Sequence, residues 1–278
     1  MTPNLDAPSD EFEHAFARVL DLAEKNVWAA HNRLIEVAEV GILSTSMPEV
    51  TVWRLHLGAS ANFSGVLQCL RTRASSLAAL SLIRGLTESW THLHFIADKA
   101  ESGTPAQRAI RYEAGLYKEW QYTDMSARPS LDHQQTPSID SSIIQQLWTQ
   151  HGGGEKLAHR TYKHVPETWK KIKHPPKFEI LKILHKSTSN AAHMNAVDFI
   201  LSITDSQIRI EGVSDERRSA WLLTTIYCFD KLTLCALEAI SKNTSEVARS
   251  LHSSWDEILD SPVLAKAIAT MAKVEHGL

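Results

Sequence analysis

The segment from about residue 74 to residue 98 constrains the fold more than any other part of the chain. Its apolar residues surround most of the circumference of a helix instead of forming one stripe; they are Leu77, Leu80, Leu82, Ile83, Leu86, Trp90, Leu93 and Ile96. A helix that is apolar nearly all round is packed among other helices. The segment therefore predicts a central helix of an α-helical core.

Helical spacing and helix-capping residues recur along the rest of the chain. Ser9, Thr104 and Ser214 each stand where a side chain can cap a helix, and Pro105 suits a first helical position. Residues 207–211 alternate and predict one arm of a β-hairpin. The predicted helices span about 9–40, 50–70, 74–98, 104–125, 138–151, 177–192, 214–241 and two shorter segments within 243–276.

This organisation predicts an all-α fold: a single large helical bundle of about seven to nine helices, with at most a minor β-hairpin. Hydrophobic residues make up 43% and charged residues 22% of the 278 residues, which is typical of a folded globular protein. We expect one helical domain over 1–278. Its core covers about 60–240, and the N-terminal helix 9–40 and the C-terminal helices 243–276 pack on it.

Several features favour a cytoplasmic protein without a membrane anchor. The first ten residues lack the basic start and apolar run of a signal peptide. The longest apolar stretches, Leu77–Ile83 and Ala220–Phe229, fall short of the roughly 20 residues that a membrane helix needs. Three cysteines, an odd number, indicate reduced thiols. Cys228 and Cys235 are seven residues apart on one helix face, as small core residues or, alternatively, as a metal-binding pair.

A narrow polar stripe interrupts the apolar segment 74–98. Ser81, Arg84, Glu88 and His92 follow one another at steps of three, four and four residues, and Arg84 and Glu88 can form an ion pair one helical turn apart. The stripe either faces water, forms a buried structural clamp, or belongs to a functional site. If it is buried, its charges need further partners, because an unpaired buried charge is costly.

A second polar cluster lies at the end of the predicted helix 177–192 and contains Ser189, Asn190 and His193. A histidine at a helix end can bond terminal carbonyls, which is the structural alternative to a catalytic role. The candidate catalytic residues of the chain are therefore Arg84, Glu88, His92, Ser189, Asn190 and His193.

The pattern Arg84-x-x-x-Glu88 followed by Ser189-x-x-x-His193 resembles an uncharacterised bacterial family of all-helical domains. The resemblance covers about residues 60–240 and implies a helical fold without a defined activity. It also implies that the two polar clusters meet, so we expect Arg84 and Glu88 to be mostly buried, paired with each other and close to His193.

More remotely, the chain is similar to HEPN domains, helical proteins of toxin–antitoxin and phage-defence systems. Catalytic members cleave RNA with an Arg-x4-6-His motif, which implies an RNase or a nucleotide-dependent defence effector. The chain departs from this motif, because Lys186 stands where the arginine before His193 would be. The literal match, Arg128 to His133, lies in a segment bounded by prolines.

The segment 156–186 is locally basic in a chain whose net charge is -3. Basic side chains interleaved with aromatic ones suit phosphate contact and base stacking. The alternative is a solvated face that balances acidic neighbours. Nucleic acid, a nucleotide and a second copy of the chain in a homodimer are the partners left open. The candidate nucleic-acid-binding residues are Lys163, Trp169, Lys170, Lys171, Lys173 and Lys177.

Carboxylate–histidine spacings raise a di-iron bundle as a further alternative. Such a site needs two Glu-x-x-His helices, and the chain has one, Glu11-x-x-His14. We therefore expect no metal and no cofactor. A binding module is the leading functional hypothesis, a HEPN-like RNase or effector the second, and a metal-dependent helical-bundle enzyme the third.

Overall fold

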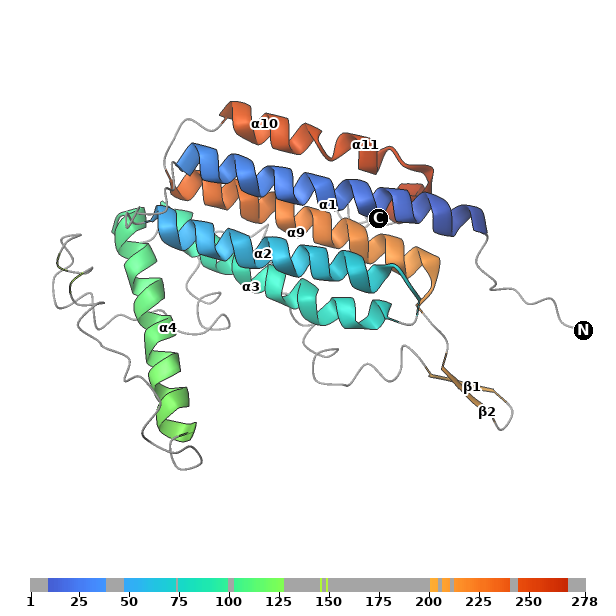
Figure 1. The fold of residues 1–278 in the computed structure, drawn as a ribbon, viewed down its shortest axis with the longest axis horizontal. Coiled ribbons are helices and arrows are strands. Elements are labelled where there is room, and N and C mark those ends of the chain that lie inside the picture. Colours follow the sequence, from blue (N-terminus) through green and yellow to red (C-terminus); the bar gives the residue numbers. More distant parts are fainter. Residues whose placement is uncertain are drawn as a thin grey trace, which may run out of the picture.

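The computed structural model describes most of the first half of the chain and most of its last quarter (Figure 1). Side chains are described except in 117–127 and 201–210. The described residues are 10–38, 48–73, 75–99, 103–127, 146, 149, 201–204, 207–210, 213–240 and 245–269. Within these ranges the chain is predominantly helical, which confirms the predicted all-α bundle.

Five long helices dominate the described part, and their bounds lie close to those expected from the sequence. A short 3-10 turn, η1 (Ser76–Ala78), opens the third of them. The long helices are α1 (Asp10–Ala38), α2 (Glu49–Leu70), α3 (Ala79–Ala97), α4 (Pro105–Ala127) and α9 (Asp215–Ala239).

Short elements complete the described chain. Strands β1 (Leu201–Thr204) and β2 (Gln207–Ile210) pair antiparallel, which confirms the predicted minor hairpin. After α9 come α10 (Ser245–Ser253), α11 (Asp256–Leu259) and the 3-10 turn η4 (Pro262–Leu264). The helices predicted over 138–151 and 177–192 lie outside the described residues, apart from two isolated helical positions at 146 and 149.

Two of the predicted caps are present. The Thr104 backbone N–H donates to the Gln107 side chain (3.0 Å), and the Gln107 backbone N–H donates to Thr104 Oγ1 (3.3 Å), so the start of α4 forms a reciprocal capping box. The Ser214 hydroxyl accepts from the Arg217 backbone N–H at the start of α9 (3.4 Å). Ser9 lies outside the described residues.

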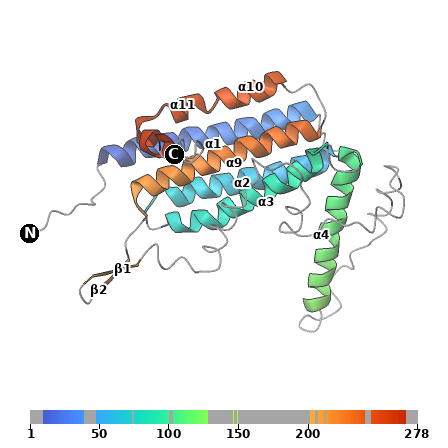
Figure 2. The same ribbon diagram turned by 180° about the vertical axis from the view of Figure 1, so that it is seen from behind.

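Contacts along the helices define their directions. Arg71 at the end of α2 pairs with Asp21 of α1 (2.7 Å), and His56 of α2 contacts His31 of α1, so residue numbers fall along α2 as they rise along α1 and the two helices are antiparallel. The Val213 N–H donates to the carbonyl of Arg73 (3.2 Å), so α9 starts beside the end of α2 and runs parallel to α1 and α3. Figures 1 and 2 show α1, α9, α2 and α3 side by side, with α10 and α11 along α1 and with α4 turned away from the bundle axis.

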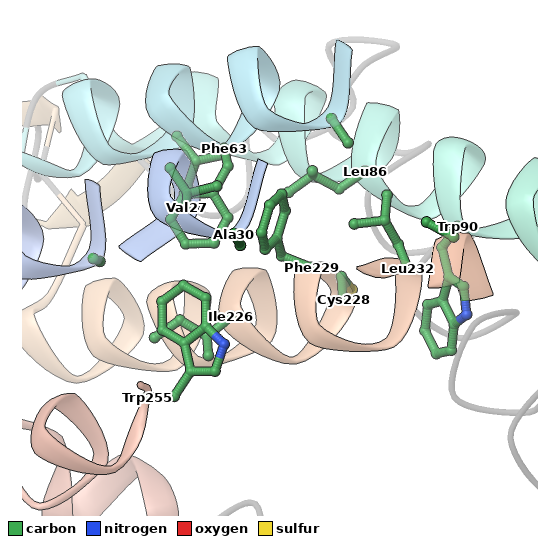
Figure 3. Close-up of a cluster of buried hydrophobic side chains, with 14 of the residues drawn as sticks. Val27, Ala30, Phe63, Leu86, Trp90, Ile226, Cys228, Phe229, Leu232 and Trp255 are labelled. Carbon is green, nitrogen blue, oxygen red and sulfur yellow. The ribbon is translucent and has the colours of Figure 1, made fainter. Parts of the chain in front are cut away.

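The core lies between these parallel and antiparallel helices, as Figure 3 shows. The ring of Phe229 on α9 contacts that of Phe63 on α2 (centroids 5.1 Å apart), and both rings contact Trp255 at 6.3 and 5.8 Å. Burying an aromatic side chain of this kind stabilises a fold by roughly 1.5–3 kcal/mol. These rings join α2 and α9 to the C-terminal segment.

Two helices share the centre of the described bundle: α3, which the apolar pattern of 74–98 predicted, and α9. α9 contacts α1, α2, α3, α10 and η4, whereas α3 leaves one face partly exposed. Among the described helices, α9 alone is long and apolar enough to cross a membrane by length and composition. Of its most apolar 18-residue window, 67% is buried inside the bundle, which accounts for that composition.

Glycines allow α2 and α3 to approach closely. A Cβ on Gly85 of α3 would lie 2.5 Å from Nδ2 of Asn62, and a Cβ on Gly65 of α2 would lie 2.9 Å from Cδ1 of Leu82. Both contacts are shorter than ordinary van der Waals separation, so a side chain at either position would require the side chain of Asn62 or Leu82 to move.

Candidate functional site

The polar stripe lies on the partly exposed face of α3. Arg84 Nε donates to Glu88 Oε1 (2.9 Å), which confirms the predicted ion pair. The two side chains are 28% and 35% exposed, so the pair is only partly buried. His92, one turn further, packs its ring against Tyr112 of α4 (4.9 Å). The stripe is therefore a half-open polar face and not a buried clamp.

The other predicted site residues lie outside the described residues. These are Ser189, Asn190 and His193 of the second polar cluster, and Lys163, Trp169, Lys170, Lys171, Lys173 and Lys177 of the basic segment. The expected approach of His193 to Arg84 and Glu88 therefore stays a prediction.

A fully buried charge lies at Arg218, on the first turn of α9. Its fully buried guanidinium forms two hydrogen bonds with Glu13 (2.7 and 3.1 Å) and two with the carbonyl of Leu70 (3.0 and 2.7 Å). It also lies over the ring of Phe16, 4.7 Å from the centroid, and 3.2 Å from Asp215. The residue ties α1, α2 and α9 together, so its role is structural.

Two further polar contacts anchor α4 to the bundle. Glu113 accepts from Arg54 with both oxygens (2.9 and 2.8 Å) and from the hydroxyl of Thr51 (2.8 Å), both on α2. Arg108 is buried and donates to the carbonyls of Ile96 and Gly103, which belong to the end of α3 and the turn after it. These residues hold the base of α4 in place while its remainder leaves the bundle.

A buried histidine pair lies between α1, α2 and α9. The rings of His31 and His56 stack (centroids 5.3 Å apart), with 3.1 Å between their Nδ1 atoms. The Thr233 hydroxyl donates to the Phe229 carbonyl (2.8 Å), so it accepts from His56 Nε2 (2.9 Å). His56 Nδ1 is then the acceptor for the N–H of His31.

Burial keeps both rings of this pair neutral. It lowers the pKa of His56 to about 3, with a further contribution from His31, and it lowers the pKa of His31 as well. Among the described residues, the hydrogen-bonding partners of the two rings are uncharged. The pair is therefore a neutral polar joint in the core, and each proton that it gains must be accommodated without a counter-charge.

Ligand binding by the described bundle depends on how its metal-ligating side chains are grouped and on the groove on its surface. In the part of the chain that the structure describes, no three or more His, Cys, Asp and Glu side chains gather to hold a metal ion. An open groove of about 820 Å³ lies between α1 and the segment from α11 to η4. Its charged lining mixes both signs, with Arg18, Asp21, Lys25, Glu257 and Asp260.

Neither sequence nor structure comparison supplies a relative. The sequence matches no protein-family model, and no curated protein and no solved structure is significantly similar to it. The resemblance to the bacterial helical family and to HEPN domains therefore rests on the short motifs alone.

Sequence reasoning missed Arg218, Glu113 and the histidine pair. Arg218 follows Arg217 at the start of an apolar helix, and the apolar residues that follow it at helical spacing were the one available signal. Nothing local marked His31 and His56, because their contact joins α1 and α2 at positions 25 residues apart in the sequence. Long-range partners of this kind become visible only when the helices are packed.

Proposed function

We propose that the protein is a cytoplasmic binding module that engages single-stranded nucleic acid through the basic segment 156–186, with the helical bundle as its carrier. The observation that supports this is the separation of charge along the chain. Nine basic residues against two glutamates give the segment a formal charge of +7. Because the whole chain carries -3, the remainder carries -10.

This separation concentrates the attraction for phosphate in one segment. Lysine and arginine side chains that neutralise phosphates release counterions, which is the main source of sequence-independent affinity. Trp169 lies next to Lys170 and Lys171, and an indole ring can stack on any base. The groove on α1 is a poorer candidate, since Asp21, Glu257 and Asp260 would repel phosphate there.

The thiols support the cytoplasmic part of the proposal. Cys69, Cys228 and Cys235 are all free, and two of them are buried within the bundle. Free thiols of this kind persist where the environment is reducing.

A binding assay on the full chain tests the proposal. A fluorescein-labelled, mixed-sequence RNA of 20 nucleotides is titrated with protein, and fluorescence anisotropy gives the affinity. Replacing Lys170, Lys171 and Lys173 by alanine should weaken binding roughly tenfold or more at low salt. The matched control replaces Arg18, Lys25 and Arg33, which are exposed on α1, and removes the same charge. Equal loss in both triple variants would contradict a segment-specific site.

The same mixtures separate binding from RNA cleavage. Denaturing gels of the RNA after incubation should show it intact if the protein is a binding module. RNA that is cleaved by the unaltered protein but stays intact with the His193→Ala variant would instead favour the HEPN-like alternative. Its candidate residues are Arg84, Glu88, His92, Ser189, Asn190 and His193.

A further inference from the structure

Three side chains with complementary chemistry meet where α3 and α9 end together. Cys235 Sγ of α9 lies 3.9 Å from His94 Nδ1 of α3. The other ring nitrogen, His94 Nε2, lies 3.8 Å from Asp98 Oδ2, just past the end of α3. The thiol and the carboxylate thus lie beside opposite nitrogens of one imidazole ring.

We propose that these residues form a reactive-thiol site, with Cys235 as nucleophile, His94 as proton acceptor and Asp98 as the residue that positions the imidazole. A carboxylate beside Nε2 favours the tautomer that carries its proton there. Nδ1 then presents a lone pair to the thiol. A base within reach of a thiol, itself oriented by a third group, is the arrangement that activates a nucleophile.

The other two thiols of the chain lack this arrangement. Burial raises the pKa of Cys228 to about 12, and burial also raises the pKa of Cys69. The shift to the neutral form makes both poor nucleophiles, since the thiolate is the reacting species. The chain therefore carries two internal references for Cys235.

Access to the site limits the ligands it takes. Cys235 is buried, whereas the side chain of His94 is 26% exposed, so the site opens on the histidine side. The ligand class is small electrophiles with a good leaving group. With iodoacetamide, a C–S bond forms as the C–I bond breaks, iodide leaves, and the thiol proton passes to His94 Nδ1.

Several other charged groups at this end of the bundle have partners of their own. Lys231, one turn before Cys235, pairs with Asp230 (3.2 Å), and its ammonium lies over the ring of Tyr227. On α4, Arg108 bonds carbonyls and Arg111 lies over Phe95. On α2, Arg54 pairs with Glu113, while Glu49 begins the helix and Glu238 of α9 is exposed. Asp98 is the carboxylate that pairs with His94.

The test follows alkylation of each thiol by iodoacetamide from pH 5.5 to 9.5. Trypsin releases the three cysteines in separate peptides, 55–71 for Cys69, 219–231 for Cys228 and 232–242 for Cys235. Mass spectrometry therefore gives three rates from one sample of the folded, full-length protein. Thermal melts at each pH confirm that the protein stays folded.

The expected result is a rate profile for Cys235 whose midpoint lies near pH 6.5, well below the value of about 8.5 for an ordinary thiol. At pH 6.5 the thiolate fraction is then about fifty times that of an ordinary thiol. The lower intrinsic nucleophilicity of this thiolate reduces the rate advantage by a factor of roughly six to ten. His94→Gln keeps the side-chain volume and removes the base, so it should slow Cys235 at pH 6.5 about fivefold and move the midpoint above pH 8. His252→Gln, a change at an exposed histidine, should leave the profile unchanged.

A second variant guards against a fold effect at His94. Asp98→Asn keeps the shape of the positioning residue and should raise the midpoint by a smaller amount than His94→Gln. A midpoint for Cys235 at or above pH 8 in the unaltered protein would overturn the proposal. So would an absence of labelling in the folded protein, or a profile that His94→Gln leaves in place.

Discussion

Arg218 shows what allows a guanidinium to lie inside a helical bundle. Nearby groups compensate its positive charge; they are the carboxylate of Glu13, the carbonyl of Leu70, the carboxylate of Asp215 and the ring of Phe16. A buried charge with this many partners is stable in place, but its loss leaves those partners unsatisfied.

Arg218→Ala should therefore lower the free energy of unfolding by about 3–5 kcal/mol, measured by urea denaturation. The control is Arg33→Ala, because Arg33 and Glu36 are 54% and 61% exposed and such a pair contributes about 0–1 kcal/mol. Arg84→Ala should fall between the two, since its ion pair is partly buried. A loss at Arg84 as large as that at Arg218 would restore the buried clamp that the sequence suggested.

His56 gives the stability of the protein a defined pH dependence. Its pKa is about 3 in the folded protein and 6.5 in an ordinary histidine, so the unfolded chain binds the proton first as pH falls. The stability is complete above pH 6.5 and decreases between pH 6.5 and about 3, by about 1.4 kcal/mol for each pH unit from this residue.

The His56→Gln variant tests this pH dependence. Glutamine can still bond Thr233 but cannot take up a proton in this range, so the slope of stability against pH should flatten below pH 6.5. His252→Gln, at a side chain that is 68% exposed, is the control. An equal slope in the unaltered protein and in His56→Gln would show that the pair does not carry the acid sensitivity.

The residue scale is where prediction from sequence was weakest. The ion pair between Arg84 and Glu88 was predicted because the two residues are four positions apart, a spacing that places them on the same face of a helix. Glu13 and Arg218 are 205 positions apart, and no local pattern links them. His94 and Cys235, separated by 141 positions, were equally hidden. Local spacing identifies pairs within a helix, whereas tertiary packing creates the rest.

At the scale of elements, the close approach of α2 and α3 crowds some of their glycines and leaves others open. Gly58 of α2 is exposed, and a Cβ there would meet nothing within 4 Å. A Cβ on Gly85 would press on Asn62. The same change to alanine should therefore have different effects on stability at Gly58 and at Gly85.

Gly58→Ala should raise the free energy of unfolding by about 0.5–1 kcal/mol, because alanine favours the helix. Gly85→Ala should raise the free energy of unfolding by less than Gly58→Ala, or should lower it, because the side chain of Asn62 must move. Combining Gly85→Ala with Asn62→Ala should recover the helix gain. Chemical denaturation of these three variants and of Asn62→Ala alone measures this, and an equal gain from both single glycine changes would contradict the close approach.

The helices themselves were largely predictable from sequence. Apolar periodicity and caps such as Thr104 and Ser214 gave bounds close to the observed ones. The central position of α3 was predictable from its apolar circumference. α9 shares that position, and the sequence did not single it out as central.

At the scale of the molecule, the chain consists of the helical bundle and a long connection between α3 and α9. α9 runs parallel to α3, so the end of α3 and the start of α9 lie at opposite ends of the bundle, and α4 and the residues up to Val213 connect them in the sequence. The basic segment 156–186 belongs to this connection. The sequence predicted the single helical bundle, but not this parallel order, which depends on contacts such as that between Val213 and Arg73.

The central claim, that the basic segment binds nucleic acid, is tested most directly by the salt dependence of RNA binding. Log affinity should fall linearly with log salt, with a slope of about -0.7 for each phosphate that the protein neutralises. Replacing Lys170, Lys171 and Lys173 by alanine should flatten this slope by up to about 2, whereas replacing Arg18, Lys25 and Arg33 should leave it in place. A slope that the first triple variant does not change would show that the segment is a solvated face and would contradict the account.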